Sequence, residues 1–180
     1  PMLSDHRAEI RLQIARALRD LNEGAFLDDV ERASLIEREP TVRQVLVEAL
    51  SRSNDTRRLP TLIRMLDDPA RQVEVVALSG VTRIASQLDP ADADALALAR
   101  RLETLLKTRD ARHDERALID AAAALRHPSL IAPLLQRLEE DPAPPAPVRV
   151  AVVVALGRIH PPGSIGPMGG PLPGEDQEER

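Results

Sequence analysis

The sequence predicts an all-helical fold of stacked helical hairpins, and three observations support this prediction. Apolar residues make up 43% of the chain and aromatic residues only 1%, so the core must consist of Leu, Ala, Val and Ile. The abundant Leu, Ala, Arg and Glu favour helix over strand. Residues 60–69 closely resemble residues 133–142 at an offset of 73, and residues 42–50 resemble residues 148–156 at an offset of 106. A period of about 35 to 36 residues explains both offsets and is typical of stacked supersecondary units.

Helix-start and helix-stop residues divide the first part of the chain into short amphipathic helices. Ser4 is expected to cap the first helix, and Gly24 follows its end. A second helix is expected over residues 26–38. Pro40, at a favoured first helical position, opens a third helix that ends near Ser51.

The same signals continue to residue 160. Asp55 is expected to cap the fourth helix, while Asp-Pro pairs open a fifth helix at residues 68–69 and a sixth at residues 89–90. A seventh helix is expected over residues 113–126. His127-Pro128 opens the eighth helix and Asp141-Pro142 precedes the ninth, which ends near Ile159. Nine helices correspond to about four and a half hairpins. From the apolar stripe of each segment we expect these side chains to be buried between layers: Leu62, Leu102, Leu135, Leu138, Val148 and Ile159.

The pattern resembles the HEAT-repeat family, and the likeness covers roughly residues 5–160. The best match to the family motif consists of Asp141, Pro142, Val148, Arg149, Ala151, Ala155, Leu156, Gly157 and Ile159. A partial match consists of Val42, Arg43, Ala49 and Leu50. A weaker one consists of Val73, Val81 and Ile84, with Glu74 where the family has Arg. The resemblance implies a right-handed α-solenoid whose paired helices form a convex and a concave side.

Residues 2–160 are therefore expected to form one repeat domain, followed by a different segment at residues 161–180. That segment is rich in Pro and Gly and ends in an acidic stretch that begins at Glu175. It is predicted to be a flexible or extended tail.

Charge and composition narrow the function classes. The net charge is −5 and the pI about 5.4, whereas a non-specific nucleic-acid binder is usually basic. Lys107 is the single lysine among 24 cationic residues, which indicates a GC-rich bacterial genome. The sequence has no apolar run of transmembrane length and no signal-peptide pattern, so we expect a cytoplasmic location without a membrane partner.

The sequence contains little that predicts catalysis. It has no cysteine, and its four histidines are expected to be exposed residues at helix boundaries: His6, His113, His127 and His160. They form no close metal-ligand pair, and the isolated glycines form no phosphate-binding loop. We therefore expect no enzyme activity, no cofactor and no metal. Metal hydroxylases with HEAT repeats use His-Glu dipeptides, which this chain lacks.

The most favoured function is a non-catalytic scaffold or adaptor that binds another protein. Two alternatives follow from the resemblance: a nucleic-acid-binding protein similar to alkylpurine DNA glycosylases, and a chromophore chaperone similar to bilin lyases. The first would require a basic face with aromatic residues, and the second a pocket large enough for a tetrapyrrole.

Two surfaces are candidates for partner binding. The period places Arg64, Arg101 and Arg137 at steps of 37 and 36, so these three side chains (the arginine row) are predicted to bind an acidic segment of a partner. The competing interpretation pairs Arg64 with Asp68 and Arg137 with Asp141 within the turn, which leaves Arg101 without a partner. The second surface is the ninth helix, Val148–Ile159, which is apolar nearly all round. The tail, a second copy or a partner must cover it.

Overall fold

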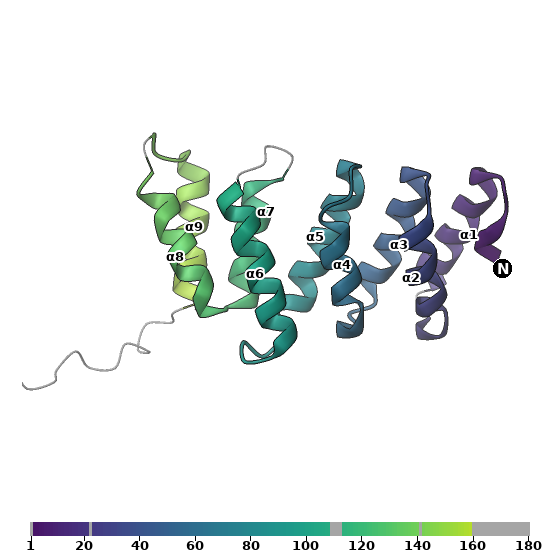
Figure 1. The fold of residues 1–180 in the computed structure, drawn as a ribbon, viewed down its shortest axis with the longest axis horizontal. Helices are drawn as coiled ribbons and strands as arrows, with labels where there is room; N and C mark the ends of the chain where they lie inside the picture. Colours follow the sequence, from purple (N-terminus) through teal and green to yellow (C-terminus); the bar gives the residue numbers. More distant parts are fainter. Residues whose placement is uncertain (1, 22, 109–112, 141, 160–180) are drawn as a thin grey trace, which may run out of the picture.

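A computed structural model of the chain describes residues 2–21, 23–108, 113–140 and 142–159. Over these residues the protein is entirely helical and contains no strand, which confirms the predicted all-α class (Figure 1). The predicted tail, residues 161–180, lies outside the described residues. The nine α-helices within them are α1 (Ala8–Leu21), α2 (Leu27–Ile36), α3 (Pro40–Arg52), α4 (Leu59–Met65), α5 (Arg71–Ala85), α6 (Ala93–Thr108), α7 (Glu115–Leu125), α8 (Ile131–Leu138) and α9 (Ala146–Ile159). Four 3-10 helices accompany them: η1 (Met2–Ser4), η2 (Gly24–Phe26), η3 (Thr56–Arg58) and η4 (Pro128–Leu130).

The helices form an elongated stack of two layers (Figure 1). Helices α1, α3, α5, α7 and α9 contact one another in succession and form the more closely packed layer. Helices α4, α6 and α8 contact one another in the second layer, and α2 precedes them. Each helix of the second layer packs against the helix that follows it in the chain. These contacts between sequence neighbours are compatible with a solenoid.

Several predicted helix starts are confirmed and others are shifted. Pro40 begins α3, and the Asp55 carboxylate accepts the backbone N–H of Arg57 at the start of η3. The first helix begins at Ala8 rather than after Ser4, because Ser4 lies within η1. Helix α5 begins at Arg71, three residues beyond Asp68. The Asp68 carboxylate accepts the backbone N–H of Ala70 before the helix and also binds Arg43 of the neighbouring helix.

The burial predictions are partly correct. Leu62, Leu102 and Ile159 are buried as predicted, and Leu138 and Val148 are half-buried against the core. The prediction for Leu135 is wrong, because 45% of its surface is exposed. In α8 the buried residues are Pro133 and Leu134, and Leu135 lies outside this buried stripe.

A repeated ion-pair arrangement joins successive helices of the closely packed layer, and we call it the arginine–carboxylate ladder. The fourth residue of α1, Arg11, donates from Nε and Nη2 to both oxygens of Glu37, at 2.8 Å each. Arg43, the fourth residue of α3, donates in the same way to Asp68 at 2.5 and 2.9 Å. Glu37 and Asp68 each lie three residues before the next helix of the layer. The ladder therefore ties α1 to the turn before α3, and α3 to the turn before α5.

The ladder has a second, identical contact in each step. Arg43 Nη1 donates to the backbone carbonyl of Glu37, and Arg11 Nη1 donates to the carbonyl of Asp5, both at 2.8 Å. Asp5 lies three residues before α1, as Glu37 lies before α3. The hydrogen bond that Arg11 donates to Glu37 holds the pKa of Glu37 below its ordinary value, and the hydrogen bond that Arg43 donates to Asp68 raises the pKa of Arg43.

The polarity of the ladder is reversed at α5, whose fourth residue is Glu74. This carboxylate hydrogen-bonds to Nδ1 of His113 at 2.6 Å, and both side chains are at least 94% buried. The expectation that the histidines are exposed boundary residues is therefore wrong for His113, because the turn before α7 places the ring against α5.

Candidate functional site

The structure places the three residues of the arginine row on successive helices of one layer. Arg64 lies on α4, Arg101 on α6 and Arg137 on α8. Helix α6 contacts both α4 and α8, so the 36- to 37-residue steps follow the order in which these helices stack. Their ion pairs differ from both sequence-based interpretations.

Arg64 is the member of the arginine row that is available to bind a carboxylate of a partner. Its side chain is exposed, and within the described residues it makes no hydrogen bond or ion pair. The predicted partner, Asp68, is bound to Arg43 of the ladder, so the local-pairing interpretation is wrong for Arg64. An exposed guanidinium with free donors can bind a carboxylate in two-point geometry.

Arg101 and Arg137 are both tied to carboxylates of the protein itself. Arg101, for which the local-pairing interpretation left no partner, forms an ion pair with Asp67, which follows α4. Its Nε is buried and has no hydrogen-bond partner within the described residues. Arg137 binds Glu115 at the start of α7 and Glu140 beyond the end of α8. The hydrogen bond to Glu115 raises the pKa of Arg137. Asp141, the predicted partner of Arg137, lies outside the described residues.

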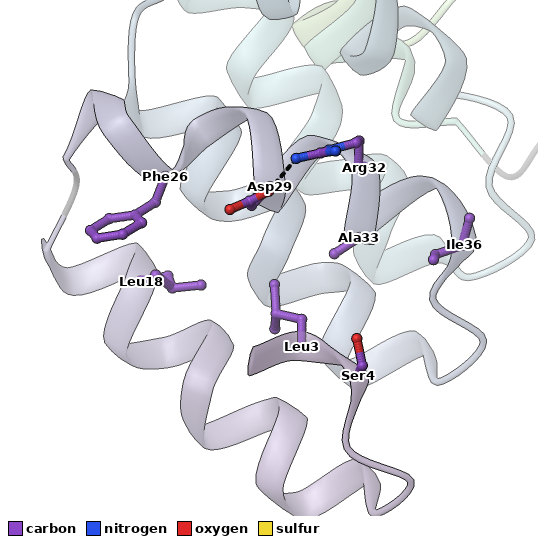
Figure 2. Close-up of a pocket in the computed structure, with 8 residues that line it drawn as sticks. All are labelled: Leu3, Ser4, Leu18, Phe26, Asp29, Arg32, Ala33 and Ile36. Atoms are coloured by element: carbon purple, nitrogen blue, oxygen red, sulfur yellow. Dashed lines mark hydrogen bonds and ion pairs between the residues drawn. The ribbon is translucent and has the colours of Figure 1, made fainter. Parts of the chain in front are cut away.

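A pocket near the amino-terminal end of the stack is a second candidate binding site, and we call it the α2 pocket. It has a volume of about 330 Å³ and lies between η1, α1 and α2 (Figure 2). Figure 2 shows Leu3 between Leu18 and Ala33, with Phe26 and Ile36 at opposite ends. The lining residues are Leu3, Ser4, Leu18, Phe26, Asp29, Arg32, Ala33 and Ile36.

The α2 pocket presents an unusual apolar surface. Ile36, the last residue of α2, is 80% exposed, and the neighbouring Leu35 is 37% exposed. The charged groups of the pocket, Asp29 and Arg32, pair with each other on the same helix. The pocket therefore has an apolar lining next to a pair of charges that compensate each other. This environment suits an apolar side chain of a binding partner.

Sequence reasoning did not identify this pocket. Phe26 is the single aromatic residue of the chain, and residues 35 and 36 are adjacent apolar residues at a helix end, where one of them must lie outside the buried stripe. These two signals mark the segment. The pocket itself depends on how η1 packs against α1, and no periodicity predicts that contact.

A further cavity of about 410 Å³ lies between α5 and α7, over Val75 and Leu78. Two of its acidic rim residues are engaged: Asp114 caps α7 with its carboxylate, and Asp120 pairs with Arg116. Among the described residues, no group of three or more His, Asp or Glu side chains is arranged to hold a metal ion. Across the same ranges, no helix has the length and apolarity needed to cross a membrane.

Comparison of the sequence with family models finds no matching family, and comparison with curated proteins finds no match.

Proposed function

We propose that this chain is a cytoplasmic, non-catalytic scaffold or adaptor, a right-handed solenoid of HEAT-like hairpins that binds another protein through its surface. The α2 pocket carries the proposal, because Ile36 exposes 80% of its surface beside an apolar cavity. Large exposed apolar groups next to a pocket are typical of protein-binding surfaces. The partner supplies an apolar side chain that packs against Leu3, Phe26 and Ile36.

The expected contribution of this contact follows from its area. Burial of an isoleucine side chain stabilises a complex by about 2 kcal/mol, or about thirtyfold in Kd. Replacement of Ile36 by Glu removes that contribution and places a charge at the pocket. Because Ile36 is exposed in the free protein, this variant should fold normally.

The experiment is affinity capture from the native host with the full chain as bait, followed by calorimetry with each purified candidate partner. Leu96→Glu is the matched control, since Leu96 is 39% exposed on α6, away from the pocket. A true partner binds the Leu96→Glu protein normally and the Ile36→Glu protein at least about tenfold more weakly. Equal Kd values for both variants would exclude the pocket as the binding site.

The arginine row supports an acidic segment in the same partner. Arg64→Gln tests this point alone, because Arg101 and Arg137 also hold the fold together. We expect a loss of about threefold in affinity at low salt and a smaller loss at high salt. The triple Gln variant of Arg64, Arg101 and Arg137 should lose more affinity and some stability. Wild-type affinity in both variants at both salt concentrations would remove the row from the binding surface.

The same purified protein distinguishes the two alternative functions. Tight, strongly salt-dependent binding of duplex DNA would replace the adaptor proposal by nucleic-acid binding. A coloured tetrapyrrole that stays bound through purification would replace it by chromophore handling.

A further inference from the structure

The two ends of the helical stack expose faces that are buried in its middle. Helix α9 exposes Val150 (61%) and Val153 (60%), and α1 exposes Leu21 (55%) and Ile10 (37%). These faces lie at opposite ends of the stack in Figure 1. The position in α3 that corresponds to Val153, 106 residues earlier, is Val47, which is fully buried. The apolar character of α9 is therefore that of an interior helix.

The residue types of the ladder also occur at both ends of the stack. Arg149 is the fourth residue of α9, the position that Arg11 and Arg43 occupy in α1 and α3. Within the described residues no carboxylate binds Arg149. At the other end Asp5 holds the acidic position of the ladder, 63 residues before Asp68, and among the described residues the arginine that binds its carboxylate is the neighbouring Arg7.

A close helix contact of the repeat depends on small residues, and small residues occupy the matching positions of the two end faces. In the middle of the stack, Ser51 of α3 is packed directly against Gly80 of α5, and a Cβ on Gly80 would lie 2.8 Å from the Ser51 Cβ. Gly157 occupies in α9 the position that Ser51 occupies in α3. Ala17 occupies in α1 the position that Gly80 occupies in α5. Both are small and exposed, so α9 and α1 can approach as closely as α3 and α5 do.

We propose that the protein associates with itself head to tail, with α9 of one copy packed against α1 of the next. In this arrangement Arg149 binds the Asp5 carboxylate, Val153 and Val150 cover Ile10 and Leu21, and Gly157 faces Ala17. The contact continues the stack that joins α1 to α3 and α3 to α5 within each copy.

The local partners of Asp5 permit this contact. Asp5 accepts the backbone N–H and the Nε of Arg7 through Oδ1, and Arg7 Nη2 donates to Oδ2. Its side chain remains 25% exposed. Asp55 makes the same local contacts with Arg57 and still accepts a hydrogen bond from Arg58 Nε through Oδ2, so a local arginine does not prevent a second ion pair. The same patch is not used on both copies, so the association forms an open chain or a ring.

Sedimentation velocity of the full chain from micromolar to millimolar concentration should show a series of oligomers. Asp5→Arg and Arg149→Asp should each weaken association at least about tenfold. An equimolar mixture of the two variants should regain it, because each retains one wild-type end, and this recovery shows that both variants are folded. A wild-type chain that stays monomeric, or a mixture that fails to associate, overturns the proposal.

Introduced cysteines identify which faces meet, because the chain has no cysteine of its own. Ala17→Cys and Gly157→Cys proteins, mixed and oxidised, should form mixed disulfide dimers, while the exposed control Ser86→Cys should not join either. Disulfides within the Gly157→Cys protein alone would indicate a symmetric contact between two α9 helices and contradict the head-to-tail arrangement. Association only after removal of residues 161–180 would assign the α9 face to the tail instead.

Discussion

Replacement of Arg43 by Met should strongly destabilise the protein while its shape is largely kept. Met preserves the aliphatic stem that packs between α3 and the following turn. It removes two hydrogen bonds to Asp68 and one to the carbonyl of Glu37. The side chains of Arg43 and Asp68 are only 11% and 7% exposed, so the variant leaves a buried carboxylate without its cationic partner and with the hydrogen bond from the Ala70 N–H.

The magnitude follows from this burial. Breaking a buried ion pair by removal of one partner costs about 3–5 kcal/mol, and the residual exposure of both groups favours the lower end, about 3 kcal/mol. For a domain of this size that loss lowers Tm by about 6–12 °C. Asp68→Asn should also be destabilising. The double variant should lose less than the sum of the two single losses, with a coupling free energy of about 2 kcal/mol.

Urea unfolding followed by circular dichroism measures the free energy of unfolding of each variant. Arg52→Met is the matched control on the same helix, because Arg52 is 46% exposed and pairs with Glu48 at i,i+4. It should change stability by no more than about 0.5 kcal/mol. If Arg43→Met loses less than about 1 kcal/mol, the ladder is not a main determinant of the stack.

Three other predictions test the packing and the charges. Gly80→Ala should destabilise by about 1–3 kcal/mol in urea unfolding, because its Cβ would meet Ser51, and the added Ser51→Gly change should recover much of the loss. The pKa of Glu37 is lowered in the folded protein, so its charge stabilises the fold above pH 4.5 and this contribution is lost as the pH falls through the folded-state pKa. The Glu37→Gln variant lacks this charge, so its free energy of unfolding should decrease less than that of the wild type below pH 4.5. Leu134→Ala should cost about 2–4 kcal/mol in thermal unfolding, whereas Leu135→Ala should cost under about 1 kcal/mol, since Leu134 is fully buried and Leu135 is 45% exposed.

The helical class and the order of helices could be predicted because proline, capping residues and the apolar stripe act locally. Asp55 and Pro40 mark real starts for this reason. The Asp68-Pro69 signal was less accurate. An aspartate near a helix start can accept a local backbone N–H and also bind a distant side chain, and Asp68 does both, with Ala70 and Arg43. Local sequence does not predict the second contact, because Arg43 lies 25 residues away.

The arginine row shows the same limit at the candidate site. The period correctly placed Arg64, Arg101 and Arg137 on successive helices. It could not predict their ion pairs, because Arg101 reaches Asp67 and Arg137 reaches Glu115 across helix contacts. The α2 pocket was missed for a related reason: it is formed by η1, which has no counterpart in the repeat pattern.

Glu74 occupies a position at which the repeat pattern has arginine, and the structure explains this difference. An acidic residue at a ladder position requires a basic or hydrogen-donating partner in the next turn, and the turn before α7 provides His113. His113 lies two residues before α7, next to the position that Glu37 and Asp68 occupy before their helices, so the pair keeps the contact with its polarity reversed. A residue that differs from the repeat motif therefore indicates that a compensating residue lies about one repeat away. In this protein His113 follows Glu74 by 39 residues. The same reasoning applies to the ends of the stack: Arg149 keeps the ladder residue type without an acidic partner among the described residues, and Asp5 offers the matching acid at the opposite end.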